Sequence, residues 1–242
     1  MDFQFWFYSR RKPGTPLWRR FLSYLILYLG VTVFVVPSVA KVCGRVVLPV
    51  FSSEVLAPHN LVTPLLNRHY VKPKLSTQLE DIASKLNTHN SALQVSYLDA
   101  NFPFIDGFPL LPHLSHNDGR KVDLSFYYTE EGERGNRKPS DTGYGKFVEP
   151  YDSEFNQSAA CLLQGYWQYN FTKYLSFGGR DDLEFDPLTT RYIVNLIISD
   201  VLTEKLFVEP HLKTRLRLDS PKVRFHGCQS VRHDDHIHYQ IR

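Results

Sequence analysis

Cysteine is scarce in this chain, with only three residues, Cys43, Cys161 and Cys228, among 242. None of them lies in a C-x2-C spacing, so a cysteine-rich zinc site is not expected. Cys161 and Cys228 are able to pair in an oxidising compartment, which would leave Cys43 unpaired. Three free thiols are the alternative, and the sequence does not choose between the two.

The chain also lacks a strong excess of charge of either sign. Lysine and arginine number 28 and aspartate and glutamate 25, which gives a formal net charge of +3. This balance provides no electrostatic footprint for nucleic acid, so nucleic acid is not expected as a partner. Internal repeats and low-complexity tracts are absent too. With 43% hydrophobic and 22% charged residues, the composition is typical of a globular protein.

Long hydrophobic runs are rare, and the exception is residues 21–40, FLSYLILYLGVTVFVVPSVA, which carry no charge. As a helix this run would span about 30 Å, the thickness of a bilayer's hydrocarbon core. We therefore predict one transmembrane anchor. A buried core helix is disfavoured because the run is apolar on every side. A cleaved signal peptide is the competing interpretation, since Ser38-Val39-Ala40 is an acceptable cleavage site.

Basic residues are concentrated before this run: five precede it, and only Lys41 and Arg45 follow closely. By the positive-inside rule, residues 1–20 form a cytoplasmic basic tail and the chain after residue 40 lies outside. We therefore expect a single-pass protein of the cytoplasmic (inner) membrane, with its main domain in the periplasm or cell envelope. Residues 41–74 contain four prolines and are expected to form an irregular stalk.

Residues 75–242 are long enough to form one domain with its own core. Their hydrophobic patterns predict helices at 75–86, 187–200 and 211–218, and strands at 93–97, 205–208, 222–225, 236–241 and from 121 onward. Asp186 is the expected N-cap of the second helix, and the polar stretch 127–151 is expected to be a long loop. Because helices and strands do not alternate regularly, we predict an α+β fold, a small antiparallel sheet with flanking helices.

Histidines cluster near the C-terminus, where residues 233–242 read HDDHIHYQIR. Ile237 and Tyr239 favour a strand, and on a strand His236 and His238 project from one face. Two adjacent imidazoles suit a metal site, or a metal ligand beside a base. A solvated, charged edge is the alternative interpretation.

A second cluster lies in LPHLSHNDGRKVDLSFYY, residues 111–128. The NDG sequence at 117–119 has strong turn chemistry, and apolar and polar residues alternate after it as in a strand. Asp123 belongs to the polar face of that strand. The turn allows His116 and Asp123 to converge at a cleft. An ordinary hairpin with a surface aspartate is the alternative.

Together the two clusters supply a set of zinc ligands. His116, Asp123 and His238 are two imidazoles and a carboxylate, which suit zinc with a fourth position left for water. His236 stands beside His238, where it can take a proton from that water, whose pKa zinc lowers to roughly 7. We therefore predict one Zn²⁺ per chain, held in a cleft of the domain.

These residues resemble a known group of metallopeptidases, which have H-x6-D followed far downstream by H-x-H and include lysostaphin-type enzymes, D-Ala-D-Ala peptidases and hedgehog domains. The nearest resemblance is to the penicillin-insensitive murein endopeptidases. Their motifs H-x-S-H-x-x-G-x-x-V-D and H-D-x-H-x-H are matched by residues 113–123 and 233–238. Residues 191–216 also resemble the family's helix, strand and helix between the motifs.

The resemblance implies a zinc metallopeptidase that hydrolyses the D-alanyl–diaminopimelate cross-links of peptidoglycan. It places zinc on the three ligands named above and makes His236 the catalytic histidine. His113 and His233 match further active-site histidines, which would support the ligands or bind substrate. Asp234 and Asp235 are expected to be solvated turn residues, and a supporting role for either beside the site is the alternative.

Two other functions compete with this one. A D,D-carboxypeptidase would use the same zinc site on free stem peptides. It is disfavoured because such relatives usually place a glutamate base upstream of the last histidine, where this chain has Asp234 and Asp235. A hedgehog-like, zinc-stabilised binding module without catalysis is disfavoured by the base beside an open metal position.

Overall fold

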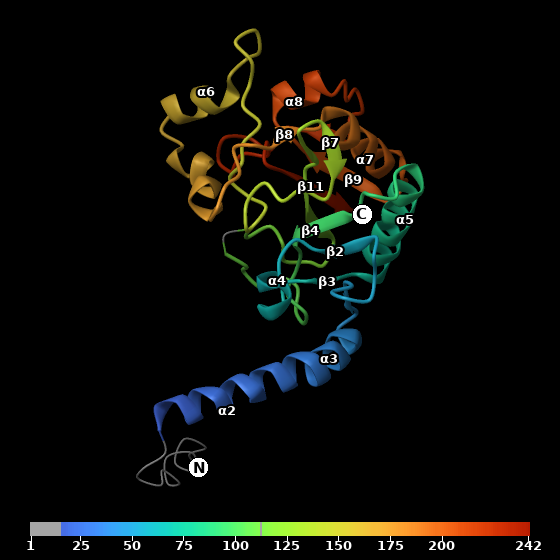
Figure 1. The fold of residues 1–242 in the computed structure, drawn as a ribbon, viewed down its shortest axis with the longest axis vertical. Coiled ribbons are helices and arrows are strands. Elements are labelled where there is room, and N and C mark those ends of the chain that lie inside the picture. The colour runs from blue at the N-terminus through green and yellow to red at the C-terminus, as the bar shows by residue number, and fades with distance from the viewer. Residues whose placement is uncertain (1–15, 112) are drawn as a thin grey trace.

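The computed structural model describes residues 16–111 and 113–242, which form an N-terminal helix and a mixed α/β domain (Figure 1). Residues 1–15, most of the expected cytoplasmic tail, lie outside the described residues. The helices are α2 (Leu17–Gly30), η1 (Val31–Val35), α3 (Val36–Val42), α4 (Val62–Leu65), α5 (Pro73–His89), α6 (Gln157–Leu163), η2 (Trp167–Leu175), α7 (Pro187–Ser199) and α8 (Pro210–Arg215). The strands are β1 (Val46–Val47), β2 (Leu56–Pro58), β3 (Tyr70–Val71), β4 (Val95–Asp99), β5 (Lys121–Ser125), β6 (Tyr128–Glu130), β7 (Glu133–Gly135), β8 (Glu184–Phe185), β9 (Thr203–Phe207), β10 (Val223–Arg224) and β11 (His236–Ile241).

The N-terminal helix runs without a break through α2, η1 and α3. Within its 26 residues, an 18-residue window has a mean hydropathy of 2.1, so the helix is long and apolar enough to cross a membrane. The π-helical segment η1 precedes Pro37, which lacks the N–H that would pair with the carbonyl of Val33, and the helix widens there. At its end the helix meets the domain, where Val36 and Ala40 pack against Tyr70.

The domain is built around a six-stranded sheet of order β10-β9-β11-β5-β4-β2. The four central strands pair antiparallel, as expected. The two edge pairs, β10 with β9 and β2 with β4, are parallel, so the sheet is mixed and the expected antiparallel sheet is confirmed only for its central strands. Each edge pair is joined by a connection that contains a helix, α8 in one and α5 in the other, as parallel neighbours require.

One face of this sheet forms the hydrophobic core with α5 and α7. Leu79 and Ile193 from these helices are fully buried in one cluster with Val122 and Tyr239 from the central strands. Helix α7 begins at the predicted N-cap, Asp186, whose carboxylate accepts hydrogen bonds from two backbone N–H groups. Because side chains on a strand alternate between faces, the polar residues of β5 and β11 are left for the opposite face.

Residues 41–74 do not form the expected irregular stalk. Strand β2 extends the six-stranded sheet beside β4, and β1 pairs with β3. Leu56 and Val71 of this segment are fully buried in the main core. The segment is therefore part of the domain. Pro58 ends β2, Pro64 lies in α4 and Pro73 begins α5.

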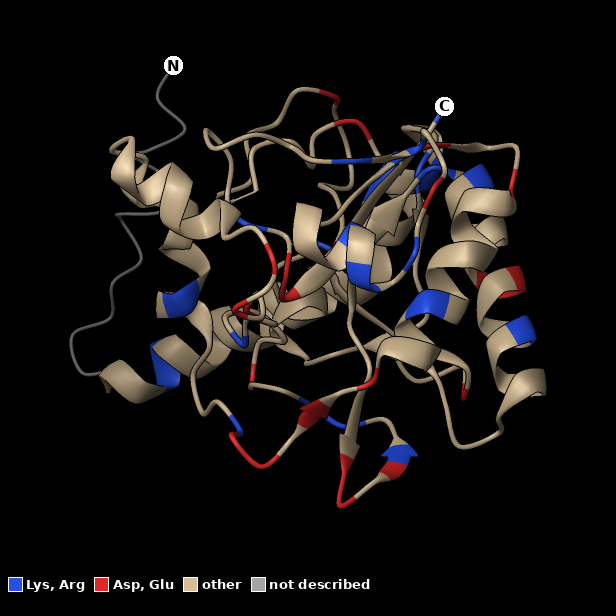
Figure 2. Ribbon diagram, turned by 90° about the horizontal axis from the view of Figure 1, so that it is seen from above, with Lys and Arg blue, Asp and Glu red and all other residues tan. Residues whose placement is uncertain are grey.

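The stretch 127–151 is only partly the loop that was expected. Its first part forms the β6–β7 hairpin, and β6 also pairs with β8. The remainder runs irregularly back over the sheet and buries Tyr144 and Val148. Over the domain, lysine and arginine are interspersed with aspartate and glutamate (Figure 2), in keeping with the small net charge.

A disulfide joins Cys161 in α6 to Cys228, with their Cα atoms 5.3 Å apart, and Cys43 is free. Of the two alternatives for the cysteines, the paired one is thus confirmed. The bond fixes α6 to the segment between β10 and β11. It therefore restrains the chain just before the histidine-rich strand.

We predict that removal of this disulfide lowers the free energy of unfolding by about 4 kcal/mol, because the bond closes a long loop in the unfolded chain. The two cysteines are 67 residues apart. The test is urea unfolding of the full chain in detergent, comparing the double variant Cys161→Ser, Cys228→Ser with Cys43→Ser as the control. Equal midpoints for the two proteins would contradict the prediction.

Candidate metal centre

The pairing of β11 with β5 sets the centre of the site. In this antiparallel register His238 lies directly opposite Asp123, and His236 lies opposite Ser125. The intervening Ile237 is fully buried in the core on the other face. The predicted alternation along β11, with histidines on one face and apolar residues on the other, is confirmed.

His116 reaches the same place from the connection between β4 and β5. The predicted turn is present, and Gly119 adopts a positive φ of +79°. A β-carbon at Gly119 would lie 1.5 Å from a guanidinium nitrogen of the buried Arg45, so another residue there would have to displace Arg45 and adopt a conformation that favours glycine. Asp118 caps the turn by accepting a hydrogen bond from the N–H of Arg120 at 3.0 Å. This turn brings the chain back from His116 into β5.

Three potential ligand atoms converge beneath the turn. Nε2 of His116 lies 3.2 Å from Oδ1 of Asp123 and 3.2 Å from Nδ1 of His238. The same Asp123 oxygen is 2.8 Å from Nδ1 of His238. This oxygen is buried and has no hydrogen-bond partner among the described residues. An orphaned carboxylate oxygen that faces two imidazole nitrogens is a donor set that fits zinc.

The protonation of these groups also suits a metal. Nδ1 of His116 lies 2.8 Å from the carbonyl of Ala100, which only an N–H can satisfy, so a neutral His116 presents the Nε2 lone pair. Burial lowers the pKa of His238 to about 4, although Asp123 opposes it. Burial by itself would raise the pKa of Asp123, but the surrounding histidines hold it well below its usual value. The site therefore combines an ionised carboxylate with neutral imidazole.

The second oxygen of Asp123 is held by other side chains. The hydroxyl of Tyr144 donates to Oδ2 at 2.7 Å, and Nδ1 of His113 lies 3.0 Å from it. His113 Nδ1 is also 3.2 Å from Asp99, and Arg68 pairs with Asp99 through two nitrogens. These contacts fix the carboxylate so that Oδ1 faces the two imidazoles.

His113 is a cation in this network. Burial opposes its protonation, but the carboxylates of Asp123 and Asp99 raise the pKa of His113 to about 10. A protonated ring is a donor rather than a metal ligand. The structure thus places His113 against a predicted ligand, in the position of a supporting residue.

His236 lies on the cleft face of β11 and is paired with Asp235. Its Nδ1 contacts the Asp235 carboxylate, and its Nε2 lies 3.8 Å from Oδ2 of Asp123. Burial lowers the pKa of His236, but the two carboxylates outweigh it and leave the pKa above its usual value. Asp235 in turn accepts a hydrogen bond from the N–H of Gly145 at 2.7 Å.

The expectation that Asp234 and Asp235 are solvated is wrong, because both are fully buried. Asp234 accepts from Nε of Arg232 at 2.6 Å, and Asp235 supports His236 as described above. A buried carboxylate requires such partners. The chain therefore makes a tight turn beneath the site with both aspartates facing inward.

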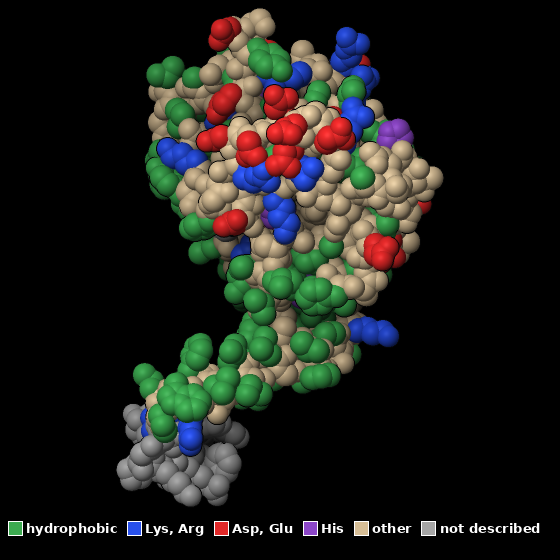
Figure 3. Space-filling model, in the orientation of Figure 1, with side chains coloured by type: hydrophobic (Ala, Val, Ile, Leu, Met, Phe, Trp, Pro, Cys, Tyr) green, Lys and Arg blue, Asp and Glu red, His purple; other side chains and the backbone are tan. Residues whose placement is uncertain are grey.

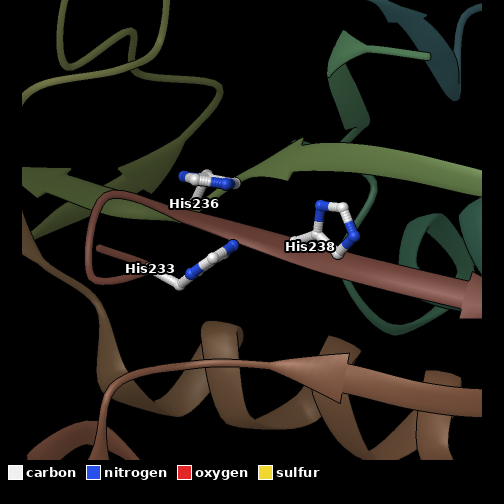
Figure 4. A group of neighbouring side chains, drawn as sticks. All are labelled: His233, His236 and His238. Atoms are coloured by element: carbon white, nitrogen blue, oxygen red, sulfur yellow. The ribbon is translucent and has the colours of Figure 1, made fainter. Parts of the chain in front are cut away.

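His233 completes the cluster from the turn before β11. Figure 4 shows His233, His236 and His238 turned toward a common space in front of the strand. Ligand atoms of these three residues lie within 4.8 Å of one another, as do those of His113, His116 and Asp123. Burial and the neighbouring histidines hold the pKa of His233 well below its usual value. The six residues that the sequence singled out thus form two adjoining groups, which are joined by the contacts of Asp123 with His236 and His238.

A cavity of about 400 Å³ gives access to this centre, and its lining includes Asp123, His236 and His238. Gln168 and Phe171 of η2 line it as well. A second cavity, of about 510 Å³, shares His113 with the first and is also lined by Arg68 and Tyr144. Two of the three potential ligands, Asp123 and His238, are therefore open to a molecule that enters the first cavity.

Three residues of the network were not singled out from the sequence: Arg68, Asp99 and Tyr144. Arg68 lies in the segment assigned to a stalk, and Asp99 ends a strand without any motif. Tyr144 lies in the glycine-containing stretch 127–151, where the length of the expected loop was the only signal. Each of these residues contacts a partner that is distant in the sequence, so the local sequence pattern does not reveal its role.

No protein-family model and no curated protein matches the chain. The function must therefore be inferred from the residues of the site and their arrangement.

Tyr144→Phe is predicted to raise the dissociation constant for Zn²⁺ by about 10- to 100-fold, the usual cost of losing a partner that orients a ligand. The control is Tyr97→Phe, because Tyr97 is equally buried in the sheet but donates to the carbonyl of Pro49 at 2.9 Å. Affinity is measured for the full chain by competition with a chromophoric chelator. If both variants bind zinc as the unaltered protein does, Tyr144 does not orient Asp123.

Proposed function

We propose that this protein is a membrane-anchored zinc metallopeptidase that hydrolyses D-alanyl–diaminopimelate cross-links of peptidoglycan. One observation carries the proposal: ligand atoms of His116, Asp123 and His238 lie within 3.2 Å of one another, with His236 adjacent. Two imidazoles and a carboxylate beside an accessible cavity are the donor set of a catalytic zinc site.

A zinc ion bound there would supply the Lewis-acid chemistry of amide hydrolysis. The protein's own residues have distinct tasks around it. Tyr144 and His113 hold one oxygen of Asp123 and leave the other to the ion. The Asp235 carboxylate accepts a hydrogen bond from the Nδ1–H of His236, so the Nε2 of a neutral His236 is left to take a proton at the cavity and later to return it.

The choice of peptidoglycan is supported by the two motifs, residues 113–123 and 233–238. The cavity suits a peptide substrate, because its lining includes both apolar and amide side chains. Leu114 and Phe171 provide apolar contacts, and Gln168 and Gln229 provide hydrogen-bonding groups.

Placement of the domain outside the cytoplasmic membrane, in the periplasm or cell envelope, belongs to the same proposal. Two observations support it. Five basic residues precede the apolar run and two follow it closely. The disulfide between Cys161 and Cys228 is of a kind that persists in oxidising compartments.

Digestion of purified sacculi by the full-length protein tests the activity, with the released fragments identified by mass spectrometry. An endopeptidase converts cross-linked muropeptide dimers into monomers. Release of terminal D-alanine alone would instead identify a carboxypeptidase. Binding of zinc without any cleavage would identify a non-catalytic binding module, and would contradict the proposal.

The two histidines of β11 are predicted to differ in their effects. His238→Ala should lose zinc and activity together. His236→Ala should keep zinc, while turnover falls by roughly 10²–10⁴-fold, the usual contribution of a positioned acid–base group. Zinc content and cleavage of cross-linked muropeptides are measured near pH 7, with the exposed His89→Ala as the control. Loss of zinc in His236→Ala would show that ligand and base are exchanged.

A further inference from the structure

The base of the domain, where it meets the N-terminal helix, carries a second feature, which the proposed peptidase site does not use. We propose that an apolar collar, formed by Val50, Phe51, Leu61 and Leu65, inserts among the acyl chains of the bilayer leaflet that adjoins the domain. The proposal rests on the anchoring of the helix in a membrane. It adds a second lipid contact, made by the folded domain itself.

The collar and the helix enclose an apolar groove of about 410 Å³. One wall comes from the helix and includes Leu29, Val33 and Pro37. The opposite wall is contributed by the four residues of the collar, together with other side chains of the domain. Figure 3 shows hydrophobic side chains gathered along the helix and over the adjoining base of the domain.

The side chains of the collar are apolar, and much of their surface is exposed to solvent. Phe51 is 84% exposed, Leu61 49% and Leu65 45%. Between Arg45 and Arg68 the sequence has one charged residue, Glu54. A contiguous apolar patch of this kind marks a surface that is covered in use.

The depth of the collar follows from its contacts with the helix. The hydroxyl of Tyr28 donates to the carbonyl of Leu65 at 2.5 Å, and the amide of Asn67 donates to Thr32 at 3.3 Å. Helix α4 is therefore level with residues 28–32. Residues 28–32 lie inside the uncharged run 21–40 that is predicted to cross the hydrocarbon core. The collar is therefore level with a part of the helix that acyl chains would surround.

This arrangement favours lipid as the molecule that covers the groove and the collar. One wall of the groove is the helix that would itself be surrounded by acyl chains, and the groove opens at the same level. A second copy of the chain could also cover an apolar patch, but it would have to replace lipid along the helix as well. The continuity of the two surfaces therefore favours the bilayer.

Insertion of the collar has a consequence for the catalytic site. The opposite side of α4, with Thr63 and neighbouring Leu66, lines the second cavity, which reaches His113 and Tyr144. With α4 in the leaflet, this cavity lies at the membrane surface. The metal centre is then held at a fixed height above the bilayer.

The experiment measures lipid contact at single sites in the full chain. In a Cys43→Ser background that keeps the disulfide, a fluorescent NBD label is attached to Phe51→Cys, Leu65→Cys, Leu27→Cys or Leu163→Cys. Leu27 is in the helix, and Leu163 is an 89% exposed leucine of α6. Each protein is placed in vesicles of phosphatidylcholine and phosphatidylglycerol with and without lipids that carry a nitroxide on the acyl chain.

The expected result is that the nitroxide lipid lowers the fluorescence at positions 27, 51 and 65 about twofold or more, and leaves position 163 unchanged. Quenching at 27 but not at 51 or 65 would overturn the collar and leave the anchor intact. Labels at 51 and 65 that are blue-shifted yet not quenched would show that protein covers the collar, which also overturns the proposal. Absence of quenching at 27 would refute the anchor and the collar together, whatever the peptidase activity.

Discussion

The antiparallel pairing of β11 with β5 is the constraint on which the site depends. It sets His238 opposite Asp123, two residues that lie far apart in the sequence. The same pairing buries Ile237 and Tyr239 against α5 and α7. A slip of one residue would turn the histidines into the core and the apolar residues into the cleft. The packing energy of the core therefore maintains the geometry of the metal ligands.

The burial of several carboxylates close together is a second constraint on the site, because each of them needs a compensating partner. Asp99, Asp123 and Asp235 are almost completely withdrawn from solvent, and a buried carboxylate is costly unless it is paired. Arg68 and a protonated His113 compensate part of this charge. An ion bound by Asp123 would compensate more, in keeping with its Oδ1 atom, which faces two imidazoles and has no hydrogen-bond partner among the described residues.

Elements and site residues that have a local signal in the sequence are predicted correctly, whereas those that depend on contacts between distant segments are not. Strand alternation located His236 and His238, the turn at residues 117–119 located His116, and the N-cap of α7 followed from one residue. Residues 41–74 were misassigned because strands of two or three residues have no readable periodicity. The buried state of Asp235 and the role of Tyr144 depend on contacts across the fold, which one-dimensional patterns do not contain.

In the proposed centre, two imidazoles and a carboxylate from distant segments hold a single zinc ion. X-ray absorption spectroscopy at the zinc edge tests this directly, on the full chain loaded with one equivalent of zinc. We predict only nitrogen and oxygen neighbours at about 2.0–2.2 Å, with the scattering signature of two imidazoles. A sulfur neighbour at about 2.3 Å, or a spectrum of hydrated zinc without imidazole, would contradict it.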